Sequence, residues 1–138
     1  MALTDDLKIT TFAPTAAGTS TITQTTGLDM AGFSGCVYVI RLGTPNATNS
    51  LKAQQCDTVG GTYADLAATA VGSGTDSPLI LDVARSSKQF LKYSITRTGA
   101  STTIDTVVAI QYGARARPVT QDARTQVEKY IGPAEGTA

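Results

Sequence analysis

The stretch from Leu79 to Pro118 decides the fold, because three strand-like runs follow one another within it. They read Leu79-Ile-Leu-Asp-Val-Ala-Arg85, then Gln89-Phe-Leu-Lys-Tyr-Ser-Ile-Thr-Arg97, then Ile104-Asp-Thr-Val-Val-Ala-Ile-Gln-Tyr-Gly-Ala-Arg-Ala-Arg-Pro118. In each run apolar residues recur at every second position, which is the period of a β-strand with one buried face. The turn-forming residues 97–102 predict a hairpin loop between the second and third runs.

The first half of the chain continues this pattern. We expect strands over 7–13, 19–26, 33–43 and 51–59, with Pro14, Gly27 and the Gly60-Gly61 pair as stops. The segment 63–71 is ambiguous, since its alanines favour a short helix while the surrounding strands favour a strand or an irregular edge, which we prefer. Seven or eight short strands without a clear helical pattern predict an all-β fold, either an antiparallel β-sandwich or a jelly roll.

The run 33–43 is the strongest strand of the first half. Cys36, Tyr38, Ile40 and Leu42 share one face, while Val37 and Val39 lie on the other. A strand with apolar residues on both faces is expected at the centre of a sheet, with both of its faces covered. Cys36 is therefore expected to be a buried free thiol.

After Pro118 the composition changes. We predict a β-sandwich-like domain over residues 1–118 and an extended polar tail over residues 119–138, which has too few apolar residues to form a layer of its own. A short helix over 120–129 is the alternative, but its apolar stripe is thin. We expect this tail to become ordered only on a partner.

Charge is balanced overall and split along the chain. The 138 residues carry 11 basic and 11 acidic side chains, with acids in excess up to Ala84 and bases in excess from Arg85 onward. Such asymmetry suits head-to-tail contacts between copies or docking on an acidic protein surface. Nucleic-acid binding would need a dense basic run with interleaved aromatics, which the sequence lacks, so we expect no nucleic-acid partner.

The sequence offers little for catalysis. It has no histidine, so Ser–His and Cys–His nucleophile pairs are excluded, although Ser–Lys or paired-carboxylate sites remain open. Asp82 and Asp105 could face each other, but we expect each to flank a strand and to pair with Lys88, Arg97 or a turn amide. The two cysteines lack metal-ligand spacing, and no glycine pair is followed by Gly-Lys-Ser/Thr. We expect no enzyme activity, cofactor or metal.

No signal-like segment opens the chain, and no apolar run approaches 18 residues. We therefore expect synthesis in the cytoplasm and no membrane partner.

The basic end of the third run is the candidate partner contact. Arg115 and Arg117 are two residues apart, so on an extended strand end they would point the same way and could clamp a neighbour's carboxylates. The alternative is a solvated strand terminus. Arg124 and Lys129 in the adjoining tail belong to the same candidate contact.

The second half resembles a known family. The segments that carry the resemblance are Leu79–Arg85, Lys92-Tyr93, Val107–Pro118 and Pro133–Ala138. Together they are similar to small structural proteins of tailed bacteriophages, in which the phrase Ala-Ile-Gln-Tyr-Gly-Ala-Arg precedes a basic residue and a proline. The chain departs from the family at Ala84, where a bulky residue is expected.

The resemblance implies a capsid decoration, or cement, protein. Such a protein would bind the major capsid protein on the outside of the head, commonly as a homotrimer, and would stabilise the expanded shell. A head–tail completion or tail-tube protein is the alternative. A sugar-binding module would want clustered aromatics, whereas the chain has no tryptophan and its tyrosines are scattered.

Overall fold

The computed structural model describes residues 2–67, 69–72, 78–99, 101–123 and 135. Among these residues the one helix is the short 3-10 turn η1 (Leu3–Asp5), and no helix within them is long and apolar enough to cross a membrane. The strands are β1 (Lys8–Phe12), β2 (Thr15–Gly18), β3 (Ile22–Thr23), β4 (Leu28–Asp29), β5 (Gly35–Gly43), β6 (Ser50–Cys56), β7 (Ala64–Asp65), β8 (Val71–Gly72), β9 (Pro78–Ala84), β10 (Phe90–Thr96) and β11 (Thr102–Tyr112).

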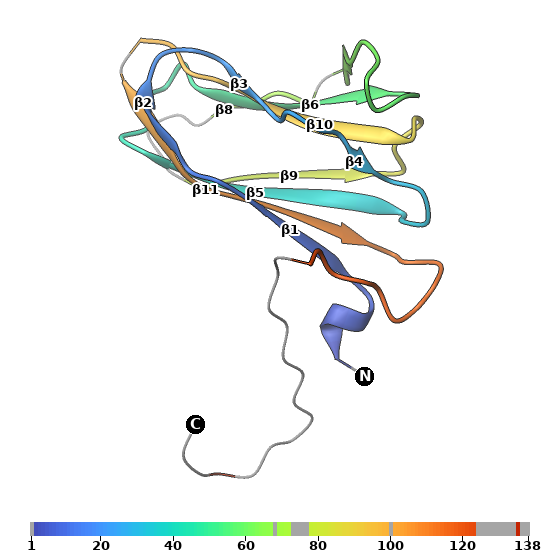
Figure 1. The fold of residues 1–138 in the computed structure, drawn as a ribbon. Helices are drawn as coiled ribbons and strands as arrows, with labels where there is room; N and C mark the ends of the chain where they lie inside the picture. Colours follow the sequence, from blue (N-terminus) through green and yellow to red (C-terminus); the bar gives the residue numbers. More distant parts are fainter. Residues whose placement is uncertain (1, 68, 73–77, 100, 124–134, 136–138) are drawn as a thin grey trace.

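These strands form two antiparallel sheets that lie one above the other (Figure 1). The first sheet has the order β1-β11-β5-β9, with β2 also on β11, and the second has the order β3-β10-β6-β7, with β4 on β10 and β8 on β6. The prediction of an all-β antiparallel sandwich is confirmed.

The core lies between the inward faces of the two sheets. The β5 residues Cys36, Tyr38, Ile40 and Leu42 are almost wholly buried, and β10 contributes Leu91, Tyr93 and Ile95 from the opposite sheet. The Tyr93 ring makes edge-to-face contacts with Tyr38 at 5.7 Å and with Phe12 at 5.3 Å between ring centroids. Alternation in the sequence therefore located the inward faces of β5, β9 and β10 correctly. For β11 the alternation that groups Ile104 with Val108 and Ile110 is wrong, because a register shift between Ile104 and Thr106 turns Val107 and Ala109 into the core instead.

The N-terminal strands differ from the sequence expectation. Only Ile22 and Thr23 form a strand within 19–26, and the unpredicted strand β2 directly follows Pro14. The reason is Gln24, a buried residue whose side-chain Oε1 accepts hydrogen bonds from the Tyr93 amide and the Tyr38 hydroxyl. The Gln24 side chain thus accepts the bond from the Tyr93 amide that a backbone carbonyl would accept in a continuous strand, so the strand is interrupted there. The ambiguous segment 63–71 contains β7 and β8, two short edge strands, as we preferred.

The strand β5 is central, but only one of its faces is covered. Val37 and Val39 point away from the second sheet and are half-exposed, so the expectation that both faces are covered is wrong for the described part of the chain. Apolar side chains on both faces of a strand indicate that both faces can be buried. They do not indicate whether the same chain or a second chain buries them.

The chain turns sharply after β11 and runs back along the N-terminal segment. Gly113 adopts a left-handed φ of 67°, and beyond it the Val119 amide donates to the Asp5 carbonyl. The Gln121 side chain accepts from the Ile9 amide and donates to the Leu7 carbonyl. Contacts to the domain thus continue past the expected boundary at residue 118 as far as Asp122, which forms an ion pair with Lys8.

Candidate functional site

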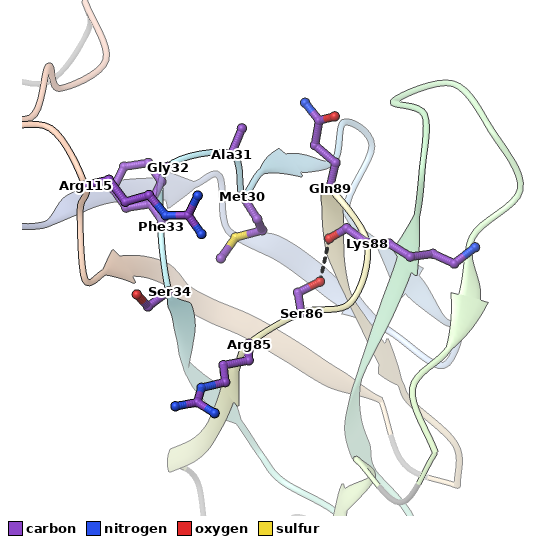
Figure 2. Close-up of a pocket in the computed structure, with 10 residues that line it drawn as sticks. All are labelled: Met30, Ala31, Gly32, Phe33, Ser34, Arg85, Ser86, Lys88, Gln89 and Arg115. Atoms are coloured by element: carbon purple, nitrogen blue, oxygen red, sulfur yellow. Dashed lines mark hydrogen bonds between the residues drawn. The ribbon is translucent and has the colours of Figure 1, made fainter.

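A hollow of about 480 Å³ opens at one end of the sandwich (Figure 2). Three segments far apart in sequence line it: the loop between β4 and β5, the turn between β9 and β10, and the segment that follows β11. The lining residues are Met30, Ala31, Gly32, Phe33, Ser34, Arg85, Ser86, Lys88, Gln89 and Arg115.

Backbone hydrogen bonds hold these three segments together. The Arg85 amide donates to the Ser34 carbonyl at 2.7 Å, and the Arg115 amide donates to the Gly32 carbonyl at 2.9 Å. The Met30 amide donates to the Gln89 carbonyl, which joins the first segment to the β9–β10 turn. The hollow is therefore a fixed part of the sandwich end, because its walls share main-chain bonds.

The charge of the hollow is one-sided. Arg85, Lys88 and Arg115 line it, and none of the described acidic residues does. Lys88 points away from the two arginines in Figure 2 and forms an ion pair with Asp57 at 2.9 Å. Arg85 and Arg115 are exposed, and no ion pair joins either to another residue in the described ranges. Two guanidinium groups are thus available to an external anion.

Arg85 has an unusual backbone. Its φ of 55° lies in the left-handed region, which costs a residue with a Cβ about 1 kcal/mol or more. The hydrogen bond from its amide to the Ser34 carbonyl holds this conformation. The turn at Arg85 ends β9 abruptly and leaves its side chain at the mouth of the hollow.

The predicted pairing of Arg115 with Arg117 is not what the described structure forms. The segment after Tyr112 bends where we expected an extended strand end, and Arg117 turns to the N-terminus. Its Nε lies 2.6 Å from Asp6 Oδ1. The two side chains form an ion pair whose geometry is not that of a hydrogen bond. Arg115 lines the hollow together with Arg85 instead. Arg124 and Lys129 lie outside the described residues.

Sequence reasoning did not select Arg85, because the relation that places it at the hollow is the pairing of strands in the sheet. Both β9 and β11 run antiparallel to β5, so β9 and β11 are parallel to each other and finish at the same edge of the sheet. Residues that directly follow these two strands must therefore lie near each other. The sequence pattern alone did not reveal that the two strands flank a common neighbour.

The carboxylates Asp82 and Asp105 do not face each other. Asp82 accepts a hydrogen bond from the Tyr112 hydroxyl at 2.7 Å, and Asp105 accepts one from the Thr103 hydroxyl at 2.7 Å. Neither pairs with the expected Lys88 or Arg97. The hydrogen bond to Asp82 is the main cause that raises the pKa of Tyr112 to about 12. Neither contact brings two carboxyl groups together, as a paired-carboxylate site requires.

Other chemistry is equally sparse in the described part of the chain. Cys36 is fully buried, and burial raises its thiol pKa to about 12, so it is a poor nucleophile. The described residues contain no group of three acidic, cysteine or histidine side chains able to hold a metal ion.

Arg97 is the residue whose role sequence reasoning missed most clearly. It is 2% exposed, and its guanidinium donates to the carbonyls of Ala16, Ser20 and Thr102 and to the Ser20 hydroxyl. It therefore fastens the β2 region to the start of β11. An arginine at a hairpin is usually solvated, so nothing in the sequence distinguished this one.

A scan against protein-family models and a search of curated proteins found no match to this chain.

Proposed function

We propose that this chain is a virion structural protein that decorates and cements a bacteriophage capsid from the outside. The observation that carries the proposal is the hollow, which presents Arg85 and Arg115 with no acidic residue in its lining. The resemblance of the second half of the chain to phage structural proteins supports the same function.

The hollow suits a carboxylate-bearing loop of a partner protein. A guanidinium offers a planar fork of donors that matches a carboxylate, and two of them on separate backbone segments can hold one or two acidic side chains. Ala31 and Phe33 add apolar surface beside the charges. The proposed occupant is therefore an acidic surface segment of the major capsid protein.

A contact made by two exposed arginines suits a site that is repeated many times. A single exposed ion pair contributes only about 0–1 kcal/mol, so one copy would bind weakly through this site alone. Icosahedral symmetry repeats the contact many times, and homotrimers, as the resemblance implies, would multiply it further. If the expanded shell binds these copies and the precursor shell does not, binding stabilises the expanded state by mass action.

A sugar-binding module has no aromatic platform among the described residues. Tyr38 and Tyr93 are buried, Tyr63 lies beneath the Lys92 ammonium at 4.1 Å, and Tyr112 is bound to Asp82, so they form no stacking platform for sugars. Tyr130 lies outside the described residues.

The test is co-sedimentation of purified protein with expanded capsids that lack it, compared with precursor capsids. Wild-type protein should bind expanded capsids at symmetric sites and raise the temperature at which they release DNA. The double variant Arg85→Ala and Arg115→Ala should bind at least about tenfold more weakly, because two charge-assisted contacts are lost.

Lys92→Ala is the control, since it removes a partly exposed positive charge of β10, outside the lining of the hollow, and should leave binding unchanged. Equal binding by the double arginine variant would show that the hollow is not the contact. Binding at the portal vertex alone would refute decoration and favour a connector.

A further inference from the structure

The outward face of the first sheet is apolar where a solvated sheet is usually polar. The second sheet packs on the other side only (Figure 1). The residues that form this outer aliphatic face are Ile9, Val37, Val39, Ile80, Val108 and Ile110. Ile80 is 62% exposed, the others are half-buried among themselves, and antiparallel sheets normally alternate to polar residues on the side that faces water.

The register arranges these side chains in two neighbouring rows across four strands. One row runs Thr11, Val108, Val39, Ile80, and the other runs Ile9, Ile110, Val37, Asp82. Since side chains directly opposite each other on one face are in contact, each row is continuous. The result is one patch and not a scatter of single apolar residues.

Opposite charges stand at opposite sides of this patch. Arg41 lies on β5 two residues beyond Val39, and Asp82 lies on β9 beside Val37. Both are exposed, and no ion pair joins either of them to a residue in the described ranges. Asp82 uses one oxygen for the Tyr112 hydroxyl, which leaves its charge in place.

This spacing is self-complementary. Arg41 and Val37 are equally far from Val39 along β5. A two-fold axis that crosses the strands at the Val39 row therefore places Arg41 of one copy over the Val37–Asp82 row of the other. Two stacked sheets are separated by about 10 Å, and neighbouring strands by about 4.8 Å, so an arginine side chain reaches the carboxylate. Both Arg41–Asp82 contacts form at once, because the arrangement is symmetric.

We propose that a second copy of this chain packs against the outer aliphatic face about this two-fold axis. Val39, Ile80 and Val108 of one copy then lie on the same residues of the other, and an Arg41–Asp82 pair closes each end. The contact is isologous, which is the usual form of a two-fold interface.

The size of the face sets the strength of this contact. Four strands and the three rows that contain Arg41, Val39 and Val37 cover about 400 Å² per copy, or about 800 Å² in total, by the spacing of strands and residues. This is below the usual size of a stable interface, so the pair should be weak and should form reversibly with rising protein concentration.

The contact does not depend on the proposed capsid function, and it leaves the basic hollow free. The described part of the segment after β11 does not compete for the face. It contacts the edge strand β1 through the Ile9 backbone amide and through the Lys8 and Thr10 side chains. Lys8 and Thr10 alternate with Ile9 along β1, so they belong to the inward face of the sheet and not to the outer aliphatic face.

The test is sedimentation equilibrium of the full chain from about 10 µM to about 1 mM, a range suited to a small reversible interface. The mass of the Ile80→Lys variant defines the basic unit, whether this is a monomer or a trimer. Wild-type protein should approach twice that mass. Val59→Lys, which places a lysine at another exposed aliphatic residue outside the sheets, should behave as wild type.

Charge reversal identifies the partner as a second copy. Arg41→Glu and Asp82→Arg should each weaken association at least about tenfold, because each turns two attractive contacts into two repulsive ones. The double variant should recover association to within a few-fold, and Tyr112→Phe controls for the hydrogen bond that Asp82→Arg also removes.

Equal masses for wild type and Ile80→Lys would overturn the proposal. Failure of the double variant to recover would also overturn it, and would assign the face to the chain's own tail or to a different protein.

Discussion

Replacement of Arg97 should destabilise the domain and leave its exposed surface unchanged, because the Arg97 side chain is buried. Its guanidinium makes four hydrogen bonds, with donor–acceptor distances of 2.7–3.2 Å, to Ala16, Ser20 and Thr102. In Arg97→Met the side-chain volume is nearly kept, while all four bonds are lost. The β2 region then loses its side-chain attachment to β11.

The magnitude follows from opposing terms. Hydrogen bonds to charged groups are each worth about 1.5–3 kcal/mol, so four of them give a gross loss of about 6–12 kcal/mol. Removal of the buried charge recovers several kcal/mol of desolvation cost. The carbonyls of Ala16 and Ser20 belong to exposed residues and can bind water instead, while the buried Thr102 loses a donor. We expect a net loss of about 2–4 kcal/mol in the free energy of unfolding.

Urea denaturation with linear extrapolation measures this loss, and a thermal melt should fall by about 3–5 °C per kcal/mol. Arg97→Lys keeps the charge but not the fork, so its stability should lie between those of Arg97→Met and wild type. Arg115→Met makes the same chemical change at an exposed site and should alter stability by less than about 0.5 kcal/mol. An Arg97→Met protein as stable as wild type would refute the anchoring role.

Two further predictions concern buried and bonded side chains that titrate. In a Cys56→Ser background, the Cys36 thiol, whose pKa burial raises to about 12, should react with a thiol reagent at pH 8 only as fast as the domain opens; rapid reaction of the folded protein would contradict the assigned burial. Tyr112, whose pKa the Asp82 hydrogen bond raises to about 12, should ionise well above the ordinary tyrosine range near 10, as measured by ultraviolet absorbance. Because the folded-state pKa is raised, the stability from this bond is present below about pH 10 and is lost as the pH rises toward 12. Asp82→Asn should move the Tyr112 titration back toward pH 10, and an unchanged titration would show that Asp82 is not the cause.

The Tyr112–Asp82 bond shows how far sequence reasoning reached. Alternation correctly predicted β9 and β11, but the bond crosses β5, and the Tyr112 ring lies so close to Gly35 that no Cβ would fit there. Only glycine at this position lets the tyrosine reach the next strand. The pairing of strands that are distant in sequence cannot be read from the period of either one.

The candidate site shows the same limit. The sequence pointed to the basic end of β11 and selected Arg115, which does line the hollow. It paired Arg115 with Arg117, because residues two apart on an extended strand share a face. The segment bends after Gly113 and is not extended, so Arg115 and Arg117 do not share a face, and Arg117 forms an ion pair with Asp6. Arg85 took its place, because β9 and β11 end at the same edge of the sheet.

The sequence by itself determined the all-β class, the inward faces of β5, β9 and β10, and the absence of histidine. These features depend on the local period of apolar residues and on composition, and both can be read without knowing which strands pair. Only the tertiary structure decided that Arg97 is buried, that Arg85 and Arg115 share one hollow, and that Val37 and Val39 lie on a face that the described chain leaves open. Each of these depends on which strands lie side by side, and strand order is set by packing over the whole chain.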